Sequence, residues 1–92
     1  MNKKRIKANV KGIVQGVCYR HFTNRTANSY GLGGYVRNCC DGSVEVVAEG
    51  EDRELKNLIA DLNRGPWSAR VDDVEVEWEE YTGNYNHFTV RF

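Results

Sequence analysis

The segment of this 92-residue chain best able to do chemistry is residues 14–20, Val-Gln-Gly-Val-Cys-Tyr-Arg, between a strand-like pattern and a short helical segment. A loop that enters a helix exposes backbone N–H groups at the positive end of the helix dipole. Arg20 adds a forked cation that can contact two oxygens of an anion, and Gly16 allows the backbone to curl. The segment predicts a cradle for a phosphate or carboxylate. The alternative is an ordinary strand-to-helix turn with a surface arginine.

The charges of the chain are divided between its two halves, although the formal net charge is zero. Residues 1–47 hold eight basic and two acidic residues, and residues 48–92 hold five basic and eleven acidic residues. The basic half contains the cradle, which favours electrostatic steering of a small anion. Two solvated faces of opposite charge explain the same division equally well.

The composition indicates one small cytoplasmic domain over residues 1–92. No apolar run is long enough for a membrane span, and Met1 to Arg5 lead directly into a strand pattern, so neither a membrane anchor nor a signal region is expected. Three cysteines cannot all pair within one chain, and the adjacent Cys39 and Cys40 disfavour a relaxed disulfide. We therefore expect reduced thiols. The absence of Cys-x-x-Cys or a His-rich cluster gives no support to a structural zinc site.

Hydrophobic spacing predicts five strands and two helices. Strands alternate apolar and polar residues, whereas the helices show apolar residues three and four positions apart. Asp41-Gly42 is a strong hairpin signal, Gly31 suits a helix C-cap, and Gly65-Pro66 ends the second helix. In chain order the expected elements are strand 6–14, helix 21–30, strand 35–38, strand 43–50, helix 51–64, strand 74–79 and strand 88–92.

This order is β-α-β-β-α-β with one short terminal strand, which is the arrangement of a ferredoxin-like α+β fold. Two amphipathic helices and an antiparallel sheet with one apolar face bury each other as a two-layer sandwich. We therefore expect both helices on the same face of the sheet. The other face of the fourth strand carries Glu75, Glu77 and Glu79, which we expect to be solvated.

Two linked motifs resemble the acylphosphatase family. The first is residues 12–20, Gly-Ile-Val-Gln-Gly-Val-Cys-Tyr-Arg, and the second is Gly-Tyr-Val-Arg-Asn at 34–38 followed by Asp-Gly-Ser-Val-Glu at 41–45. The resemblance covers essentially the whole chain, including its size and element order. It implies a ferredoxin-like fold and an enzyme that hydrolyses a carboxyl-phosphate anhydride, a small-molecule acyl phosphate, to a carboxylate and inorganic phosphate.

The resemblance also implies roles for individual residues. The catalytic arginine and asparagine of the family fall on Arg20 and Asn38, and its phosphate-binding loop falls on Gln15, Gly16, Val17, Cys18, Tyr19 and Arg20. Cys18 and Tyr35 depart from the family, where aromatic residues are common before Tyr19 and tryptophan is common before Val36. Neither departure carries the chemistry, so they bear on substrate preference and not on the type of reaction.

The expected reaction requires mainly that the enzyme hold the reacting groups in position. A carboxylate is a good leaving group, so the enzyme has mainly to hold the phosphoryl group and a water in line. Backbone N–H groups and Arg20 can stabilise charge on the phosphoryl oxygens, and the amide of Asn38 can orient the water without changing its protonation state. The proton can pass to a phosphate oxygen of the substrate. We therefore expect no cofactor and no metal, since no carboxylate cluster accompanies the cradle.

Other catalytic interpretations fit less well. A short helix points consecutive residues to different faces, which disfavours His21 as a general base, and His87 fits less well still. Only Tyr19 separates Cys18 from Arg20, too short a spacing for the loop of phosphatases with a cysteine nucleophile, so Cys18 is expected to be a packed or partly exposed thiol. A Walker-type phosphate loop is excluded because no Gly-Lys-Ser/Thr follows Gly12 at the required spacing.

Two alternatives to a small free-standing acylphosphatase remain. A non-catalytic phosphate- or RNA-binding module on the same fold needs exposed aromatic residues on a basic sheet, but strand 43–50 has no aromatic residue and the fourth strand is acidic. Acylphosphatase-like modules also occur as domains of larger enzymes that handle carbamoyl phosphate. The chain stops at Phe92, directly after the last strand, which favours the free-standing protein. We expect a monomer with no nucleic-acid or membrane partner.

Overall fold

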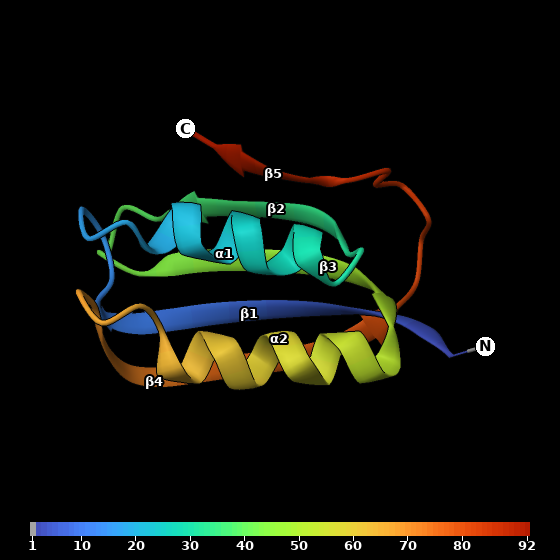
Figure 1. Ribbon diagram of the computed structural model, residues 1–92, viewed down its shortest axis with the longest axis horizontal. Helices are drawn as coiled ribbons and strands as arrows, with labels where there is room; N and C mark the ends of the chain where they lie inside the picture. The colour runs from blue at the N-terminus through green and yellow to red at the C-terminus, as the bar shows by residue number, and fades with distance from the viewer. Residues whose placement is uncertain (1) are drawn as a thin grey trace.

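The computed structural model describes residues 2–92 and contains the seven expected elements in the expected order (Figure 1). They are β1 (Lys3–Ile13), α1 (Tyr19–Ser29), β2 (Gly33–Asn38), β3 (Val44–Glu51), α2 (Asp52–Arg64), β4 (Arg70–Glu80) and β5 (Phe88–Arg91). No helix within residues 2–92 is long and apolar enough to cross a membrane.

One sheet of five strands, in the order β4-β1-β3-β2-β5, forms one layer of the molecule. β1 pairs antiparallel with β3 and β4, and β2 pairs antiparallel with β3. β5 pairs parallel with β2, with Gly34 opposite Phe88, so the sheet is mixed and not wholly antiparallel as predicted. The reason is that the segment between β4 and β5 carries the chain from one edge of the sheet to the other, so β5 arrives beside β2 in the same direction (Figure 1).

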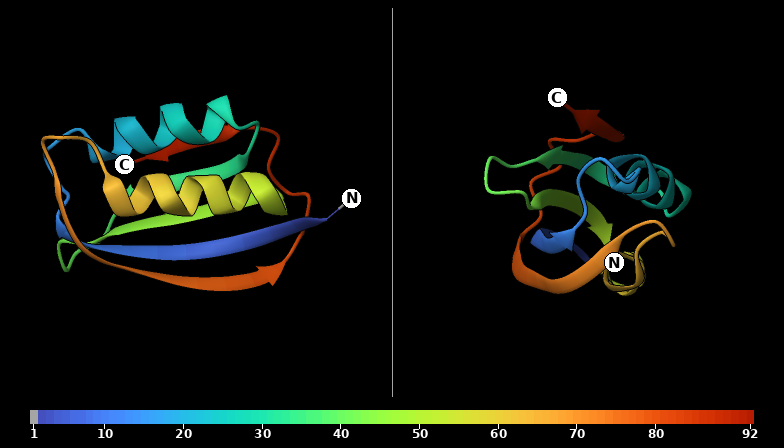
Figure 2. Two further views of the ribbon diagram at one scale, coloured as in Figure 1. Left: turned by 60° about the horizontal axis from the view of Figure 1, so that its bottom comes forward. Right: turned by 90° about the vertical axis from the view of Figure 1, so that its left-hand side faces the viewer.

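Both helices cover the same face of the sheet, as predicted, which confirms the ferredoxin-like sandwich (Figure 2). The core between the layers comes from the inward residues of the alternating strands and from the apolar stripe of α2. Its fully buried members include Ile6, Ala8, Val10, Val44, Val46, Ala48, Leu55, Leu58 and Leu62. Removing these side chains from water supplies the main driving force that holds α2 on the sheet.

α1 begins two residues earlier than predicted. The spacing of the sequence predicts Phe22, Thr26, Ala27 and Tyr30 as its covered positions, and of these only Ala27 is fully buried. The residues of α1 that are fully covered are Tyr19, Thr23 and Ala27, whereas Phe22 and Thr26 are only partly covered. These three are spaced by four residues and therefore lie in one row along the helix. Gly31 takes a left-handed conformation, with φ 71°, after the end of α1, as its C-cap role predicts.

The segment 81–87 crosses the outer face of the sheet and is held there by Glu49. The carboxylate of Glu49 accepts hydrogen bonds from the backbone N–H groups of Thr82 and Gly83, both at 3.0 Å, and from the Thr82 hydroxyl. Burial by itself raises the pKa of Glu49, but these hydrogen bonds outweigh it and hold the pKa below its usual value. The buried carboxylate thereby holds the beginning of the segment that leads to β5.

Candidate active site

The backbone between β1 and α1 forms a concave turn with free N–H groups. Gly16 and Cys18 both have left-handed backbone angles, with φ of 72° and 65°. Left-handed and right-handed residues in succession turn their N–H groups to one side, which is the geometry of an anion-binding nest. In the hydrogen-bond pattern of residues 2–92, the N–H groups of 16–20 have no backbone or side-chain partner. A set of unpaired donors therefore lies at the start of α1, where the sequence predicts the cradle.

Arg20, the second residue of α1, is held from the side of β5. One of its terminal nitrogens, Nη1, donates to the backbone oxygen of Arg91 at 3.1 Å, and its guanidinium lies 4.7 Å from the centre of the Phe92 ring. No carboxylate of the described residues pairs with Arg20. A guanidinium has five N–H donors, so most of them stay available to an anion in front of the cradle.

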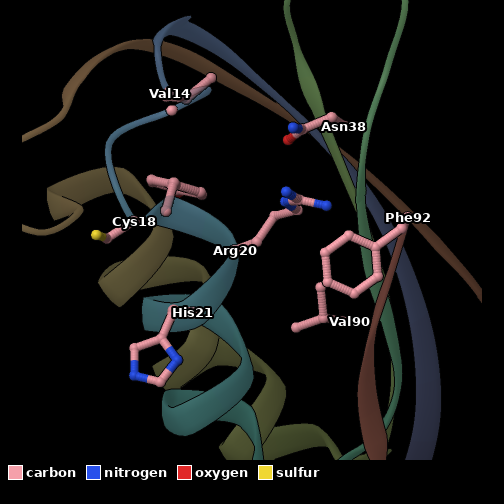
Figure 3. Close-up of a pocket in the computed structure, with 9 residues that line it drawn as sticks. Val14, Cys18, Arg20, His21, Asn38, Val90 and Phe92 are labelled. Carbon is pink, nitrogen blue, oxygen red and sulfur yellow. The ribbon is translucent and has the colours of Figure 1, made fainter.

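Asn38 stands at the end of β2, opposite Val44 of β3. The side chains of Asn38 and Arg20 come from different elements and point into the same space (Figure 3). The amide oxygen Oδ1 of Asn38 is buried and has no hydrogen-bond partner among residues 2–92. A buried acceptor without a donor is costly, so this atom is suited to a water or a ligand that supplies a proton.

The pocket between these groups is lined by Val14, Gly16, Cys18, Tyr19, Arg20, His21, Asn38, Val90 and Phe92. None of the side chains that line the pocket is acidic, so an anion there meets no negatively charged side chain. Across residues 2–92, no group of three or more His, Cys, Asp or Glu side chains is placed to hold a metal ion. The electrostatics favour a phosphate-sized anion held by donors alone.

Gln15 has a different position from the rest of the predicted loop. Its amide nitrogen donates to the backbone oxygens of Cys39 and Ser43, both at 2.8 Å. These two residues flank the turn that follows Asn38. The Gln15 side chain therefore does not face the pocket and instead ties the cradle to the turn that carries Asn38.

The side chains of Val17 and Tyr19 connect the cradle to the core of the protein. Val17 packs against the core, and its backbone oxygen accepts a hydrogen bond from the Ser68 hydroxyl at 2.8 Å. The phenol of Tyr19 is buried and donates to the backbone oxygen of Leu62 at 2.7 Å, and burial raises its pKa. The phenol therefore stays a neutral donor that anchors the start of α1 on α2. Only the N–H groups of these two residues are suited to contact an anion.

Cys18 and His21 lie at the rim of the pocket. Figure 3 shows the sulfur of Cys18 and the ring of His21 directed away from Asn38, on the other side of Arg20. Neither side chain reaches between Arg20 and Asn38. His87 is not among the residues that line the pocket.

The sequence reasoning missed the contribution of β5. Val90 and Phe92 line the pocket, and the backbone of Arg91 holds Arg20. Asn28 of α1 fixes β5 in this place, because its amide donates to the oxygen of Phe88 at 3.2 Å and accepts from the nitrogen of Phe88 at 3.3 Å. The apolar residues at positions 88, 90 and 92 indicate a strand. No local signal in the sequence predicts that this strand ends beside Arg20.

Comparison with known proteins identifies relatives over nearly the whole chain. The model of the acylphosphatase family matches residues 6–90. The acylphosphatase of Caldanaerobacter subterraneus subsp. tengcongensis is 46% identical over 88 residues, which are 96% of this chain and 98% of the relative. That of Syntrophotalea carbinolica is 44% identical over 92 residues, 100% of both chains. The crystal structure of the acylphosphatase from Bacillus subtilis superposes with a TM-score of 0.93 at 29% identity, over 97% of this chain and 99% of that one.

Proposed function

This chain belongs to the acylphosphatase family and hydrolyses the carboxyl-phosphate anhydride bond of acyl phosphates, and we propose that Arg20 and Asn38 carry out this reaction in the pocket at the start of α1. The observation that carries the assignment is the convergence of Arg20, Asn38 and the unpaired N–H groups of residues 16–20 on one space that no acidic side chain lines. The family resemblance by itself identifies Arg20 and Asn38 as candidates. Their convergence on one pocket supports their acting together.

The phosphoryl group is bound by the cradle and by Arg20. The N–H groups of residues 16–20 donate to its oxygens from the side of the loop, and the free N–H groups of Arg20 donate from the side of β5. As the bond to the acyl oxygen lengthens, negative charge is redistributed over the phosphoryl oxygens and the leaving oxygen. Donors that are already in place stabilise that charge without reorganisation.

Asn38 positions the attacking water. Its unpartnered Oδ1 accepts a hydrogen bond from the water, whose oxygen attacks phosphorus while the bond from phosphorus to the acyl oxygen breaks. The carboxylate leaves with the electron pair of that bond and needs no general acid. One proton of the water passes to a phosphate oxygen, so that the products are a carboxylate and inorganic phosphate. Asn38 itself keeps its protons throughout.

We propose that this mechanism needs no metal ion, because the leaving group is good and the charge is stabilised by fixed donors. The test is hydrolysis of benzoyl phosphate in the presence of a metal chelator. We expect full activity in the wild-type protein and a loss of kcat of about 10²-fold or more in Arg20→Ala and Asn38→Ala, as for removal of a transition-state donor. Thermal unfolding of each variant checks that the fold is retained.

Two residues of α2 provide matched controls. Arg53 and Asn57 are exposed and lie outside the pocket, so Arg53→Ala and Asn57→Ala make the same truncations without touching the site. Both controls should keep wild-type rates. The assignment of Arg20 and Asn38 is wrong if their variants stay folded and hydrolyse benzoyl phosphate as fast as the controls.

We also propose that residues 1–92 act as one monomeric, cytoplasmic domain that binds neither nucleic acid nor membranes. The free cysteines 18, 39 and 40 support a reducing compartment. On the outer face of the sheet, the basic side chains of Lys7 and Arg37 are paired with Glu45, which disfavours that face as a binding surface for RNA phosphates. Sedimentation of the purified protein and a salt-dependent titration with single-stranded RNA test these points.

A further inference from the structure

Tyr35 is one of the two residues at which the sequence departs from the acylphosphatase pattern, and the structure places it outside the phosphate pocket. It is the third residue of β2, and the next residue, Val36, is fully buried in the core. Because successive side chains of a strand point to opposite faces, Tyr35 lies on the outer face of the sheet. It is not among the residues that line the pocket. A role for Tyr35 in the reaction therefore has to come from the contacts of its ring.

The ring of Tyr35 carries the side chain of Arg91. The guanidinium carbon Cζ of Arg91 lies 3.8 Å from the centre of the ring, the shortest of the cation–aromatic distances within residues 2–92. A guanidinium at this distance is stacked on the face of the ring. Arg91 makes no ion pair with a carboxylate in the same part of the chain. The Tyr35 ring is therefore the partner of this cation.

The Tyr35 ring is itself held in place through its hydroxyl. The hydroxyl donates to Oε1 of Glu45 at 3.2 Å, and the same oxygen accepts a hydrogen bond from Nε of Arg37 at 2.6 Å. Burial of the phenol, followed by the negative charge of Glu45, raises the pKa of Tyr35. The phenol therefore stays protonated at neutral pH and keeps donating to Glu45. A ring that is anchored in this way gives Arg91 a fixed surface.

The backbone of Arg91 contacts Arg20 in the phosphate pocket. Its oxygen accepts the hydrogen bond from Nη1 of Arg20 at 3.1 Å, and the ring of the next residue, Phe92, is centred 4.7 Å from the same guanidinium. Arg91 therefore links the outer face of the sheet to the pocket. Its side chain lies on Tyr35, and its backbone holds Arg20.

The two ends of β5 are held by different contacts. Asn28 ties Phe88, the first residue of β5, to α1 with two hydrogen bonds. Arg91 is three residues further along, at the last position where β5 pairs with β2. The end of a chain is poorly ordered unless specific contacts hold it. At this end of β5, the stack of Arg91 on Tyr35 ties the strand to its neighbour, directly beside the contact with Arg20.

We propose that Tyr35 is a positioning residue for Arg20. From the outer face of the sheet, its ring fixes Arg91, and Arg91 in turn holds the Arg20 guanidinium where it can contact the phosphoryl group. This inference rests on the proposed function, because it assigns Tyr35 to the same site. Without the stack the fold remains, but the end of β5 and the Arg20 side chain gain freedom to move. The affinity of the pocket for a phosphate-sized anion is thus controlled in part from the opposite side of the sheet.

Tyr35→Leu and Arg91→Gln each remove one partner of the stack. In both variants we expect the inhibition constant of inorganic phosphate to rise about two- to fivefold, the factor that corresponds to an exposed cation–aromatic contact. The value of kcat/KM for benzoyl phosphate should fall by a similar factor. Tyr35→Trp keeps an aromatic face for Arg91 and should behave as the wild type. Thermal unfolding of each variant checks that it is folded at the assay temperature.

Trp78→Leu is the matched control. Trp78 is partly exposed and carries the Lys4 ammonium 5.7 Å from its ring centre, but it lies in β4, at the opposite edge of the sheet from β5 (Figure 1). Its truncation should leave both kinetic values unchanged.

The mobility of Arg20 gives a readout that a purely structural role of Tyr35 would not change. NMR relaxation of the Nε–H group of Arg20, measured without phosphate, reports how firmly the side chain is held. We expect a lower order parameter in Tyr35→Leu and Arg91→Gln than in the wild type and in Trp78→Leu.

Two results would overturn the inference while leaving the proposed function intact. They are a wild-type inhibition constant in folded Arg91→Gln and an unchanged Arg20 order parameter in that variant. Arg91→Gln decides the question even if Tyr35→Leu does not fold, because Arg91 is exposed and is not part of the core. A wild-type protein that neither hydrolyses benzoyl phosphate nor binds inorganic phosphate would overturn the proposed function. The order parameters by themselves decide whether Tyr35 positions Arg20.

Discussion

Replacing Gln15 by leucine removes the amide that joins the cradle to the turn after Asn38. The amide nitrogen makes two hydrogen bonds of 2.8 Å, to the backbone oxygens of Cys39 and Ser43. Each is worth about 0.5–1.5 kcal/mol net. Neither oxygen is left without a donor, because Cys39 O also accepts from Gly42 N at 3.2 Å and Ser43 O from Cys39 N at 2.9 Å. We therefore expect Gln15→Leu to lower the free energy of unfolding by about 1–2 kcal/mol, without the larger penalty of an orphaned acceptor.

The kinetic effect of Gln15→Leu should be confined to the chemical step. The turn that Gln15 holds begins directly after Asn38, so its loosening displaces the water relative to phosphorus. A displacement of about 1 Å can cost about 10²-fold in rate. We expect kcat to fall about tenfold or more. The N–H groups of residues 16–20 and Arg20 stay in place, so inhibition by inorganic phosphate should remain within about twofold of wild type, since the donors that bind it are unchanged.

Urea unfolding measures the stability of the Gln15→Leu protein, and benzoyl phosphate hydrolysis with inorganic phosphate as inhibitor separates kcat from anion binding. Asn9→Leu is the control, because Asn9 donates to the Ser43 hydroxyl at 3.0 Å, at the far end of the turn from Asn38, whereas Gln15 also holds Cys39, the residue next to Asn38. It should cost about 1 kcal/mol and leave kcat unchanged. A Gln15→Leu protein with normal kcat and weakened inhibition by phosphate would refute the reasoning and show that Gln15 is an anion ligand.

Substitutions at three further positions test single features of the structure. Tyr19→Phe removes the buried hydrogen bond to Leu62 and should cost about 1–3 kcal/mol in urea unfolding while activity persists. Cys18→Gly accepts the left-handed φ of 65° and should change stability by less than about 1 kcal/mol, whereas Cys18→Val should cost about 1–3 kcal/mol, compared by thermal unfolding. The lowered pKa of Glu49 means that its ionised form stabilises the fold above the unfolded-state pKa of about 4.3 and that this contribution is lost as pH falls through the folded value. Glu49→Gln should therefore be less stable than wild type at pH 7, and the difference should shrink in unfolding experiments below about pH 4.

Much of the fold could be predicted from hydrophobic spacing alone, because alternation and helical periodicity depend on neighbouring residues. The buried face of α1 could not be predicted in this way. The buried row of α1 includes Thr23, a small polar residue that a search for hydrophobic spacing does not count. The helix starts at Tyr19 because Cys18 adopts a left-handed conformation, which the sequence does not predict. Phe22 is one of the predicted covered positions, but in the structure it is only partly covered.

The parts of the site that escaped prediction depend on contacts between distant segments. The direction of β5 follows from the path of residues 81–87, which Glu49 holds to the sheet from 33 or more residues away. Gly33 permits that path, since a Cβ there would lie 2.7 Å from the backbone oxygen of Tyr85. Gln15 likewise reaches a turn 24 residues further along the chain. No local pattern encodes such pairings, whereas Arg20 and Asn38 lie in motifs that can be read directly.

The contact between Arg20 and β5 has a consequence for the time course of folding. The two residues that meet there, Arg20 and Arg91, are 71 positions apart, and bringing them together closes nearly the whole chain into a loop. β1, β3 and α2 can pack together before that loop closes, since β5 lies against β2 and α1. During refolding, helical circular dichroism can therefore recover while Arg20 is still free to swing away from the cradle. Recovery of hydrolysis then reports the docking of β5, a step that helical circular dichroism does not register.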